Sequence, residues 1–398
     1  MMGKIKSIPK EKYIYILLIA PFLQPPILGY VPQVNKIFFI AKLLSALVVL
    51  FFYIKELKYS KFIIAIGLYE FAIVLSTFIN KGDLTGALGD AAAVVVLCML
   101  VERQLKKDVA FALRVFIYTF LAYALINIAT LILTYPEGLL YVNGNMYFIG
   151  TDNRFVFILL PLVTFSLIYS ELTEGKLNWK SIGILVMSFL MLVSVWSVAA
   201  MLGIGMFAIY CLFIYKKNRF RVFNYLSYGA FFIVSNILIL VFKIQDKFSF
   251  ILEALFKKDV TFSGRVYLWQ WGLAYIKKSP LIGYGIEFTD VIAKKFSGYT
   301  HLHNYIINIL YVGGIIALII FFLIHVVVGR KLMKYKSNAM AGVTSFSLFI
   351  ALILSIFDTL EFPLFFVMLL FGYHIDELMK QQDNLVAEKA TIISNKKE

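Results

Sequence analysis

The chain has 398 residues, of which 61% are hydrophobic and 17% aromatic, while only 15% are charged. Soluble globular domains carry about 25% charged residues, so this composition excludes a soluble protein and indicates an integral membrane protein. The formal net charge of +15 does not indicate a nucleic-acid-binding protein, because the lysines and arginines gather in short loops between apolar runs, as expected of a topology signal.

Apolar runs of bilayer length follow one another along the whole chain. They predict an all-α polytopic membrane protein with about twelve transmembrane helices. The first run contains Pro25 and Pro26 and no small-residue cleavage site follows it, so we interpret it as a retained span. The expected spans cover residues 13–31, 36–54, 62–80, 84–102, 109–134, 155–171, 181–197, 198–215, 222–243, 304–328, 338–357 and 360–375.

The loops between these spans alternate in charge. By the positive-inside rule, the basic loops face the cytoplasm, which predicts a multi-pass protein of the cytoplasmic (inner) membrane with both termini cytoplasmic. Residues 1–379 are expected to form one transmembrane domain, and the polar residues 380–398 a disordered cytoplasmic tail. The basic loop residues are Lys55, Lys58, Lys61, Arg103, Lys106, Lys107, Lys176, Lys180, Lys216, Lys217, Arg219, Arg221, Arg330, Lys331, Lys334 and Lys336.

One long loop, at about 244–303 between the ninth and tenth spans, is expected on the external face. Loops of this length without a helix of their own are uncommon. The segment "SGRVYLWQWGLAYIKK" predicts a short interfacial helix that begins at the N-cap Ser263 and places Trp269 and Trp271 near the lipid headgroups. Its apolar stripe consists of Val266, Trp269, Leu273 and Ile276.

Two arginines lie where an anion could bind. Arg265 is expected in the first turn of the loop helix, where free backbone N–H groups and the helix dipole favour an anion and a guanidinium adds bidentate contacts. Arg154 opens the span at Phe155, and an ionisable residue at a membrane edge is a functional candidate. For both, an interfacial arginine that reaches the lipid headgroups remains an open alternative.

Two of the four histidines stand at the external mouth of the tenth span. A neutral imidazole can take a proton from a hydroxyl near physiological pH. We predict no metal site, because His301 and His303 at positions i and i+2 do not share a helix face and no nearby cysteine or carboxylate completes a metal shell. Asp358 and Glu361 are short-loop acids that suit either sugar hydroxyls or a solvated turn.

The turn "SPLIGYG", residues 279–285, contains Pro280, Gly283 and Gly285 and is expected to redirect the chain back towards the membrane. It does not fit a phosphate-binding glycine-rich loop, because no strand precedes it. The sequence also lacks a Walker motif, a zinc-protease pentapeptide and a nucleophile elbow. We therefore expect a reaction without a cofactor, on a substrate that arrives already activated.

The segment "SGRVYLWQWGLAYIKKSPLIGYG", followed by "HLHNYIINILYVGGIIALIIFF", resembles the signature region of the O-antigen ligase and polymerase superfamily of bacterial membrane glycosyltransferases. The resemblance implies a helical-bundle glycosyltransferase of the C type (GT-C-like) that acts on the outer face of the cytoplasmic membrane without a metal. Its donor would be a saccharide on undecaprenyl pyrophosphate, and membrane lipids would surround both substrates.

The resemblance also assigns residues. Arg265 matches the loop arginine that holds the pyrophosphate, and His303, directly before Asn304, matches the histidine proposed as the base. The remaining positions expected to bind the pyrophosphate or the sugar are Arg154, Tyr284, His301, Asn304 and Tyr305.

Within the superfamily, the composition rich in Lys, Ile and Phe and the lack of a long acceptor-specific insertion favour a polysaccharide polymerase of O-antigen, capsular or exopolysaccharide biosynthesis. A ligase that transfers the glycan to a lipid A core or another acceptor remains open. A lipid-linked oligosaccharide flippase is the alternative of another class, but it would need two similar halves and cations within its spans. A flippase and a chain-length regulator are candidate partners of the polymerase.

Overall fold

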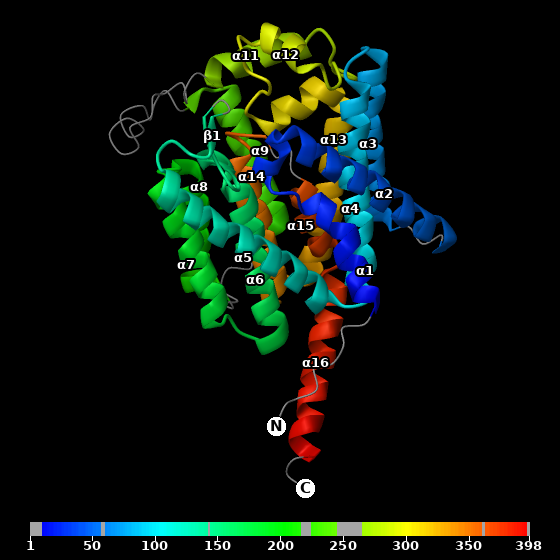
Figure 1. Ribbon diagram of the computed structural model, residues 1–398, viewed down its shortest axis with the longest axis vertical. Coiled ribbons are helices and arrows are strands. Elements are labelled where there is room, and N and C mark those ends of the chain that lie inside the picture. Colours follow the sequence, from blue (N-terminus) through cyan, green and yellow to red (C-terminus); the bar gives the residue numbers. More distant parts are fainter. Residues whose placement is uncertain are drawn as a thin grey trace.

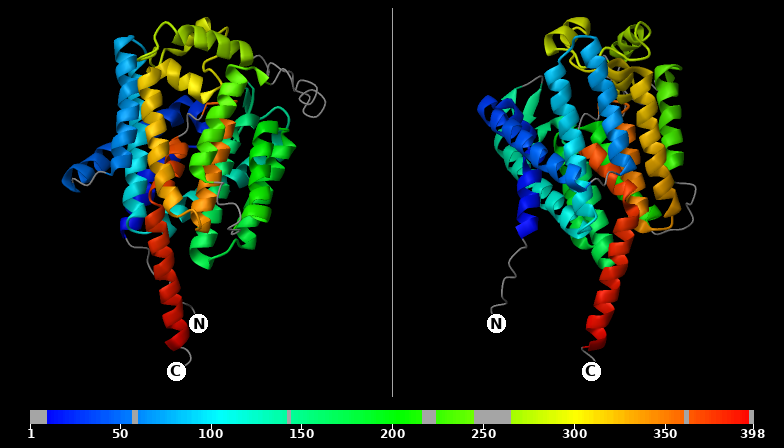
Figure 2. Two further views of the ribbon diagram at one scale, coloured as in Figure 1. Left: turned by 180° about the vertical axis from the view of Figure 1, so that it is seen from behind. Right: turned by 90° about the vertical axis from the view of Figure 1, so that its right-hand side faces the viewer.

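The computed structural model is a bundle of helices that run roughly along one long axis (Figures 1 and 2). It describes residues 10–56, 60–141, 144–215, 224–244, 265–359 and 363–395. Helix α16 (Ile375–Asn395) projects from one end of the bundle, and α11 (Arg265–Ile276) and α12 (Thr289–Lys295) cover the other end. We call the end that α11 and α12 cover the loop end.

The remaining elements follow in chain order. The first part of the bundle contains α1 (Lys10–Ile19), η1 (Ala20–Leu23), η2 (Pro26–Tyr30), α2 (Pro32–Glu56), α3 (Lys61–Ile79), α4 (Leu84–Leu105) and α5 (Val109–Thr134). The middle part contains α6 (Val156–Glu174), α7 (Trp179–Ser194), α8 (Val198–Ile209), η4 (Tyr210–Ile214) and α9 (Tyr225–Leu240). The last part adds α13 (Tyr305–Lys334), α14 (Ala339–Leu354) and α15 (Pro363–Tyr373).

Polar caps explain where many of these helices begin. An Asn, Asp or Ser side chain at the N-cap accepts a hydrogen bond from a free backbone N–H of the first turn, which satisfies a donor that the helix itself cannot. Because one such residue both ends a loop and starts a helix, the connections stay short. The capping residues are Ser60, Asp83, Asp108, Asn178, Asn224, Asn304 and Asn338.

Helix α6 lies at the centre of the bundle and is buried along nearly its whole length. It packs against α5, α7, α14 and α15, while α13 packs against α3, α9 and α15. Aromatic rings fill the centre: Phe165 of α6 lies 5.1 Å from Phe116 and 4.9 Å from Phe371 between ring centroids. Because these rings come from α5, α6 and α15, they hold helices from both halves of the chain together.

By length and composition, six helical segments in the described part of the chain could cross a membrane, and five shorter apolar helices accompany them. The protein is therefore a multi-pass membrane protein, and the total of about twelve spans stays a prediction. The first expected span, 13–31, is wrong as a single helix. Proline lacks an N–H. Helix α1 ends at Ile19, before Pro21 in η1, and Pro25 lies between η1 and η2, which begins at Pro26.

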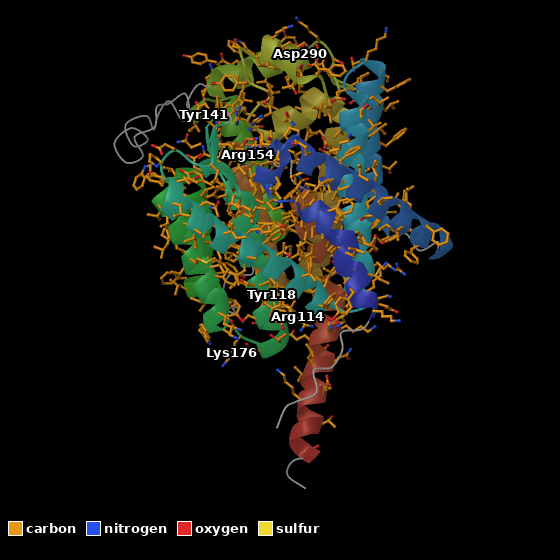
Figure 3. The ribbon with its side chains drawn as sticks, in the orientation of Figure 1. Arg114, Tyr118, Tyr141, Arg154, Lys176 and Asp290 are labelled. Atoms are coloured by element: carbon orange, nitrogen blue, oxygen red, sulfur yellow. The ribbon has the colours of Figure 1, made fainter. Side chains whose placement is uncertain are left out.

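Charged side chains lie at both ends of the bundle (Figure 3), and the orientation of the two ends in a membrane stays a prediction. Figure 3 shows Arg154 and Asp290 towards the loop end, and Arg114 and Lys176 towards the opposite end, from which α16 projects. The start of α1 and the end of α16 lie at that same end (Figure 1). The structure therefore agrees with an even number of membrane crossings between these two helices.

Residues 279–285 dock into a break in α13. The backbone of Gly314 leaves the helical conformation (φ 63°), so four backbone groups around it lose their helical partners. The N–H groups of Tyr284 and Gly285 donate to the carbonyls of Tyr311 and Val312 at 2.7 and 2.9 Å. In the opposite direction, the N–H groups of Ile315 and Ile316 donate to the carbonyls of Pro280 and Leu281 at 2.9 and 3.3 Å.

Helix α11 forms where the sequence predicted a loop helix, although the expected cap Ser263 lies outside the described residues. The expected interfacial position of Trp269 is wrong, because its side chain is only 2% exposed. It belongs to a second apolar cluster with Phe296 and Leu302, packed beneath α11 and α12 against the start of α13. Trp271 is 43% exposed and remains available to lipid headgroups.

The tail predicted to be disordered over 380–398 is helical up to Asn395, as part of α16. This helix is held by side-chain contacts near its start. The Gln381 side-chain oxygen accepts hydrogen bonds from the backbone N–H groups of Val109 and Ala110, at 2.7 and 3.2 Å. Gln382 donates to the carbonyl of Glu171 at 2.9 Å. These contacts supply stability that the polar composition alone did not indicate.

A small antiparallel sheet precedes α6 and was not predicted. Its strands, in spatial order, are β1 (Leu140–Tyr141), β2 (Asn145–Tyr147) and β3 (Gly150–Thr151). The fully buried Asn127 of α5 accepts a hydrogen bond from the N–H of Ile149 at 3.1 Å and so fixes the turn between β2 and β3. The short helix η3 (Asp152–Arg154) follows directly, which places Arg154 at the loop end.

We expect Gly314→Ala to destabilise the fold. A Cβ on Gly314 would lie 2.2 Å from the carbonyl oxygen of Leu281, and its positive φ disfavours a side chain. The expected loss is roughly 1–3 kcal/mol or more, measured as a lower Tm in detergent. Gly67→Ala in α3, where a Cβ meets nothing within 4 Å, is the matched control and should keep the wild-type Tm. Equal Tm values for the two variants would contradict the role of the break.

Candidate functional site

A cavity of about 700 Å³ opens at the loop end of the bundle. One side of it is formed by the β2–β3 turn and η3, and the other by the start of α11 and residues 297–303. It brings together four of the residues that the sequence singled out, from segments far apart in the chain. These four residues are Arg154, Arg265, His301 and His303.

Arg265 is the first residue of α11 and is partly buried at the cavity wall. Its guanidinium donates one hydrogen bond to the backbone carbonyl of Phe357, which leaves its other donors available to a ligand. Burial lowers the pKa of Arg265, an effect that the carboxylate of Asp358 opposes. Because the pKa of an arginine lies far above neutral pH, the side chain stays protonated and supplies a fixed positive charge.

Arg154 lines the same cavity, at the end of η3 and one residue before the N-cap of α6. Among the described residues it forms no hydrogen bond and no ion pair. A cation without a partner, in one cavity with a second cation, is an arrangement that an anionic ligand would stabilise. The two arginines together therefore fit a ligand that carries more than one negative charge.

His303 and His301 both point at Asp358. The Nδ1 atom of His303 lies 3.3 Å from Oδ1 of Asp358, and Nε2 of His301 lies 3.6 Å from the same oxygen. The two imidazole rings are 4.1 Å apart between centroids. Two histidines at i and i+2 can converge because this segment is not helical and His303 has a positive φ of 47°.

The environment favours a neutral His303 beside an ionised Asp358. Burial lowers the pKa of His303, and although the Asp358 hydrogen bond opposes this effect, the net direction is down. Burial raises the pKa of Asp358, but the close approach of His301, the hydrogen bond from His303 and the charge of Arg265 hold it well below its usual range. If Nδ1 of His303 carries the proton and donates a hydrogen bond to Asp358, Nε2 has a free lone pair that can accept a proton.

The same three side chains could also bind a cation. One ligand atom from each of His301, His303 and Asp358 lies within 4.8 Å of the others, a spacing that a divalent ion could bridge. The sequence predicted no metal site because the carboxylate, 55 residues after His303, was not recognised as a neighbour. A bound metal would take the same nitrogen lone pairs that proton transfer needs, so the two uses of these histidines exclude each other.

Three of the predicted substrate-binding residues do not line this cavity. Asn304 is fully buried and uses its side chain as the N-cap of α13 and as a donor to the carbonyl of Ile356 at 3.0 Å. Tyr284 stacks on Tyr311 and donates its hydroxyl to the carbonyl of Tyr275 at 3.2 Å. Tyr305 is directed into a neighbouring cavity. Tyr284 and Asn304 have structural roles instead.

Other cavity residues were not predicted as site residues. Asp358 was interpreted as a short-loop acid that suits either sugar hydroxyls or a solvated turn, and Glu361 lies outside the described residues. Asp152 and Asn153 of η3 also line the cavity. The polar run "TDNR" in an otherwise apolar region was the sequence signal for these two residues. The sheet that brings the run to the cavity could not be predicted, because its strands have only two or three residues.

Comparison with protein families gives one match. Residues 182–322 match the O-antigen ligase family, which confirms the resemblance to the O-antigen ligase and polymerase superfamily. The matched segment runs from α7 into α13 and contains Arg265, His301 and His303, whereas Arg154 and Asp358 lie outside it. No match was found among curated proteins.

We expect His303 to titrate below the ordinary histidine pKa of about 6.5, because burial disfavours its charged form. Asp358→Asn should lower that pKa further, since the carboxylate that favours the imidazolium is removed. Histidine NMR titration in detergent would measure both, with His303→Gln as the assignment variant. The signal of His374, which contacts Glu102 instead, is the internal control. A pKa of His303 that rises in Asp358→Asn would contradict this account.

Proposed function

We propose that this relative of the O-antigen ligases and polymerases is a membrane glycosyltransferase of the polysaccharide polymerase type, with a GT-C-like architecture. It would transfer a growing glycan from undecaprenyl pyrophosphate to a hydroxyl at the non-reducing end of another lipid-linked repeat unit. The observation that supports this proposal is the joint placement of Arg154, Arg265 and the His303–Asp358 pair around one cavity.

In the proposed step, the acceptor hydroxyl oxygen forms a bond with the anomeric carbon of the donor glycan. The bond between that carbon and the pyrophosphate oxygen breaks, and its electron pair leaves with the lipid pyrophosphate. Nε2 of His303 takes the proton of the hydroxyl, while Asp358 stabilises the resulting imidazolium. Arg154 and Arg265 stabilise the charge that develops on the leaving group, so no separate acid is needed.

We further propose that the loop end faces the exterior and that both termini lie in the cytoplasm. The lysines and arginines between successive helices support this orientation, because basic loops remain on the cytoplasmic side. Lys176 and Arg114 lie towards the end from which α16 projects (Figure 3). In the cytoplasmic membrane of a bacterium, the candidate site would then meet lipid-linked glycans at the outer leaflet.

A polymerase should make a ladder of products from its lipid-pyrophosphate-linked repeat unit alone. We expect the reconstituted wild-type protein to do so and Arg265→Ala to lose both donor binding and the ladder. Arg265→Lys should recover only part of the activity, because an ammonium cannot make the bidentate contacts of a guanidinium. His303→Ala should lower turnover about 100- to 10,000-fold while it still binds donor. Lys277→Ala, an exposed lysine just after α11, is the charge-matched control.

The other outcomes separate the alternatives. Transfer that requires a lipid A core acceptor, with no ladder from the repeat unit alone, would identify a ligase. Movement of the lipid-linked repeat unit across the bilayer without a new glycosidic bond would identify a flippase. A ladder at the wild-type rate from His303→Ala would remove this histidine from the mechanism.

A second prediction concerns the alternative use of His301, His303 and Asp358 as metal ligands. If His303 is the base, activity should persist after dialysis against EDTA, and added Zn²⁺ should inhibit by occupying the imidazole nitrogens. His301→Gln should weaken this inhibition because it removes one ligand. Loss of activity in EDTA that returns with a divalent metal would instead assign the three residues to a metal centre.

A further inference from the structure

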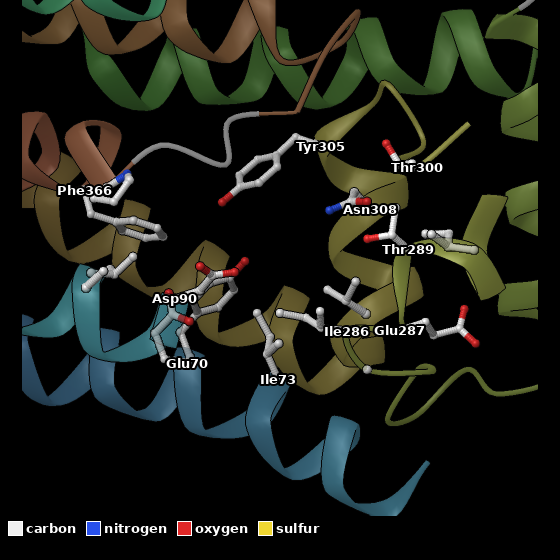
Figure 4. Close-up of a pocket in the computed structure, with 17 residues that line it drawn as sticks. Glu70, Ile73, Asp90, Ile286, Glu287, Thr289, Thr300, Tyr305, Asn308 and Phe366 are labelled. Carbon is white, nitrogen blue, oxygen red and sulfur yellow. The ribbon is translucent and has the colours of Figure 1, made fainter. Parts of the chain in front are cut away.

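A second cavity, of about 430 Å³, lies beside the candidate site, between α3, α4 and the start of α13 (Figure 4). Three acids line it, and none of the described residues in its lining is basic, whereas arginines and histidines line the first cavity. Glu70 and Asp90 lie at one end, near Phe366, and Thr289 and Asn308 lie towards the other. Its volume is within the range of small-ligand pockets, about 300–1,000 Å³.

Glu70 is the unusual member of this lining. It lies in the middle of α3, a helix long and apolar enough to cross a membrane, and its side chain is only 8% exposed. It forms no hydrogen bond and no ion pair with any described residue, whereas the charge of Asp90 is opposed by Lys42 of α2. A buried carboxyl group without a hydrogen-bond partner inside a membrane is costly and marks a functional site by default.

The two cavities share a wall, the segment 300–305. Thr300 lines both of them. His303 faces the first cavity and Tyr305, two residues later, faces the second. A saccharide held in the acidic cavity could therefore extend past Thr300 and present a hydroxyl to His303.

We propose that the acidic cavity binds the acceptor saccharide at its non-reducing end. This inference rests on the proposed function, in which one anionic donor and one hydroxyl-bearing acceptor meet at His303. Carboxylates accept hydrogen bonds from sugar hydroxyls, and Asn308 and Thr289 can donate as well as accept. The apolar face of the ring would pack on Phe366 and Tyr69, which also line the cavity.

The charge of the lining selects the ligand class. Like charges repel, so Asp90 disfavours a pyrophosphate, or a sugar that carries a carboxylate, at this position. The favoured acceptor end is a neutral hexose or an amino sugar. Glu287 is the third acid of the lining, but it already accepts a hydrogen bond from Tyr311 at 2.5 Å and pairs with Lys295 at 2.6 Å. Its contribution to the ligand is therefore secondary.

The test uses the repeat-unit oligosaccharide released from its lipid pyrophosphate by mild acid, because this probe can accept but cannot donate. Saturation-transfer NMR with the full-length protein in detergent would measure its binding. We expect Glu70→Gln and Asp90→Asn each to weaken binding about tenfold or more, as when a hydrogen bond to a charged group is lost. Arg265→Ala should bind the probe like wild type, and inorganic pyrophosphate should not displace it.

The variants carry their own control for folding. Glu70→Gln keeps the shape of the side chain and removes a buried carboxyl group that has no partner, so its Tm should equal or exceed that of the wild type. Asp290→Asn, an exposed acid of α12, should change neither Tm nor binding. Wild-type affinity of the probe for Glu70→Gln and Asp90→Asn would overturn the inference, as would its displacement by pyrophosphate.

Failure of the proposed function would look different. One outcome is that binding of the oligosaccharide depends on Glu70 and Asp90, but the oligosaccharide is never extended when lipid-linked donor is added. This outcome would keep the subsite and reject the polymerase. Glycan transfer onto the soluble oligosaccharide with an unchanged KM for it in Glu70→Gln would keep the polymerase and reject the subsite.

Discussion

A backbone group in the interior of a membrane must find a hydrogen-bond partner within the protein, because lipid offers none. Helix α13 breaks at Gly314, and residues 280–285 supply the missing partners in both directions. Only glycine fits at this contact, since a Cβ on Gly283 would lie 2.4 Å from the carbonyl oxygen of Tyr311. The loop is therefore tied into α13 through main-chain bonds. Side chains around it can vary without releasing it.

The candidate site depends on this anchorage. The docked loop follows α11 directly, so it fixes the helix that carries Arg265 above the start of α13. A second set of contacts ties the start of α13 to the end of α14: Tyr305 donates its N–H to the carbonyl of Ser355 at 2.9 Å, and Asn304 donates to that of Ile356. These bonds bring Asp358 beside His303. Asn304 is thus a positioning residue, which accounts for its place next to the histidine.

The sequence correctly predicted helices whose bounds depend on the residues within each segment. Spans such as 62–80, 84–102 and 109–134 agree with α3, α4 and α5, because length, hydropathy and polar caps act within each segment. It also identified Arg154, Arg265, His301 and His303, which are polar in an apolar chain. It could not predict that Asp358 faces His303 or that residues 279–285 enter α13, because both depend on contacts between distant segments. The same limit explains the misplaced Trp269.

A cavity with two arginines and an acidic cavity, both beside His303, would address a problem that the proposed polymerase faces, because its donor and acceptor are chemically alike. In the proposed reaction, the donor and the acceptor glycan each carry a pyrophosphate, so the site would need a feature that keeps the two from exchanging places. Two like charges 4 Å apart repel by about 4 kcal/mol in an environment of intermediate dielectric constant. An acidic cavity would therefore reject the pyrophosphate end, while Arg154 and Arg265 attract it. In this arrangement, the unpaired Glu70 costs stability in the empty protein and gains its partners only when the sugar end of an acceptor enters.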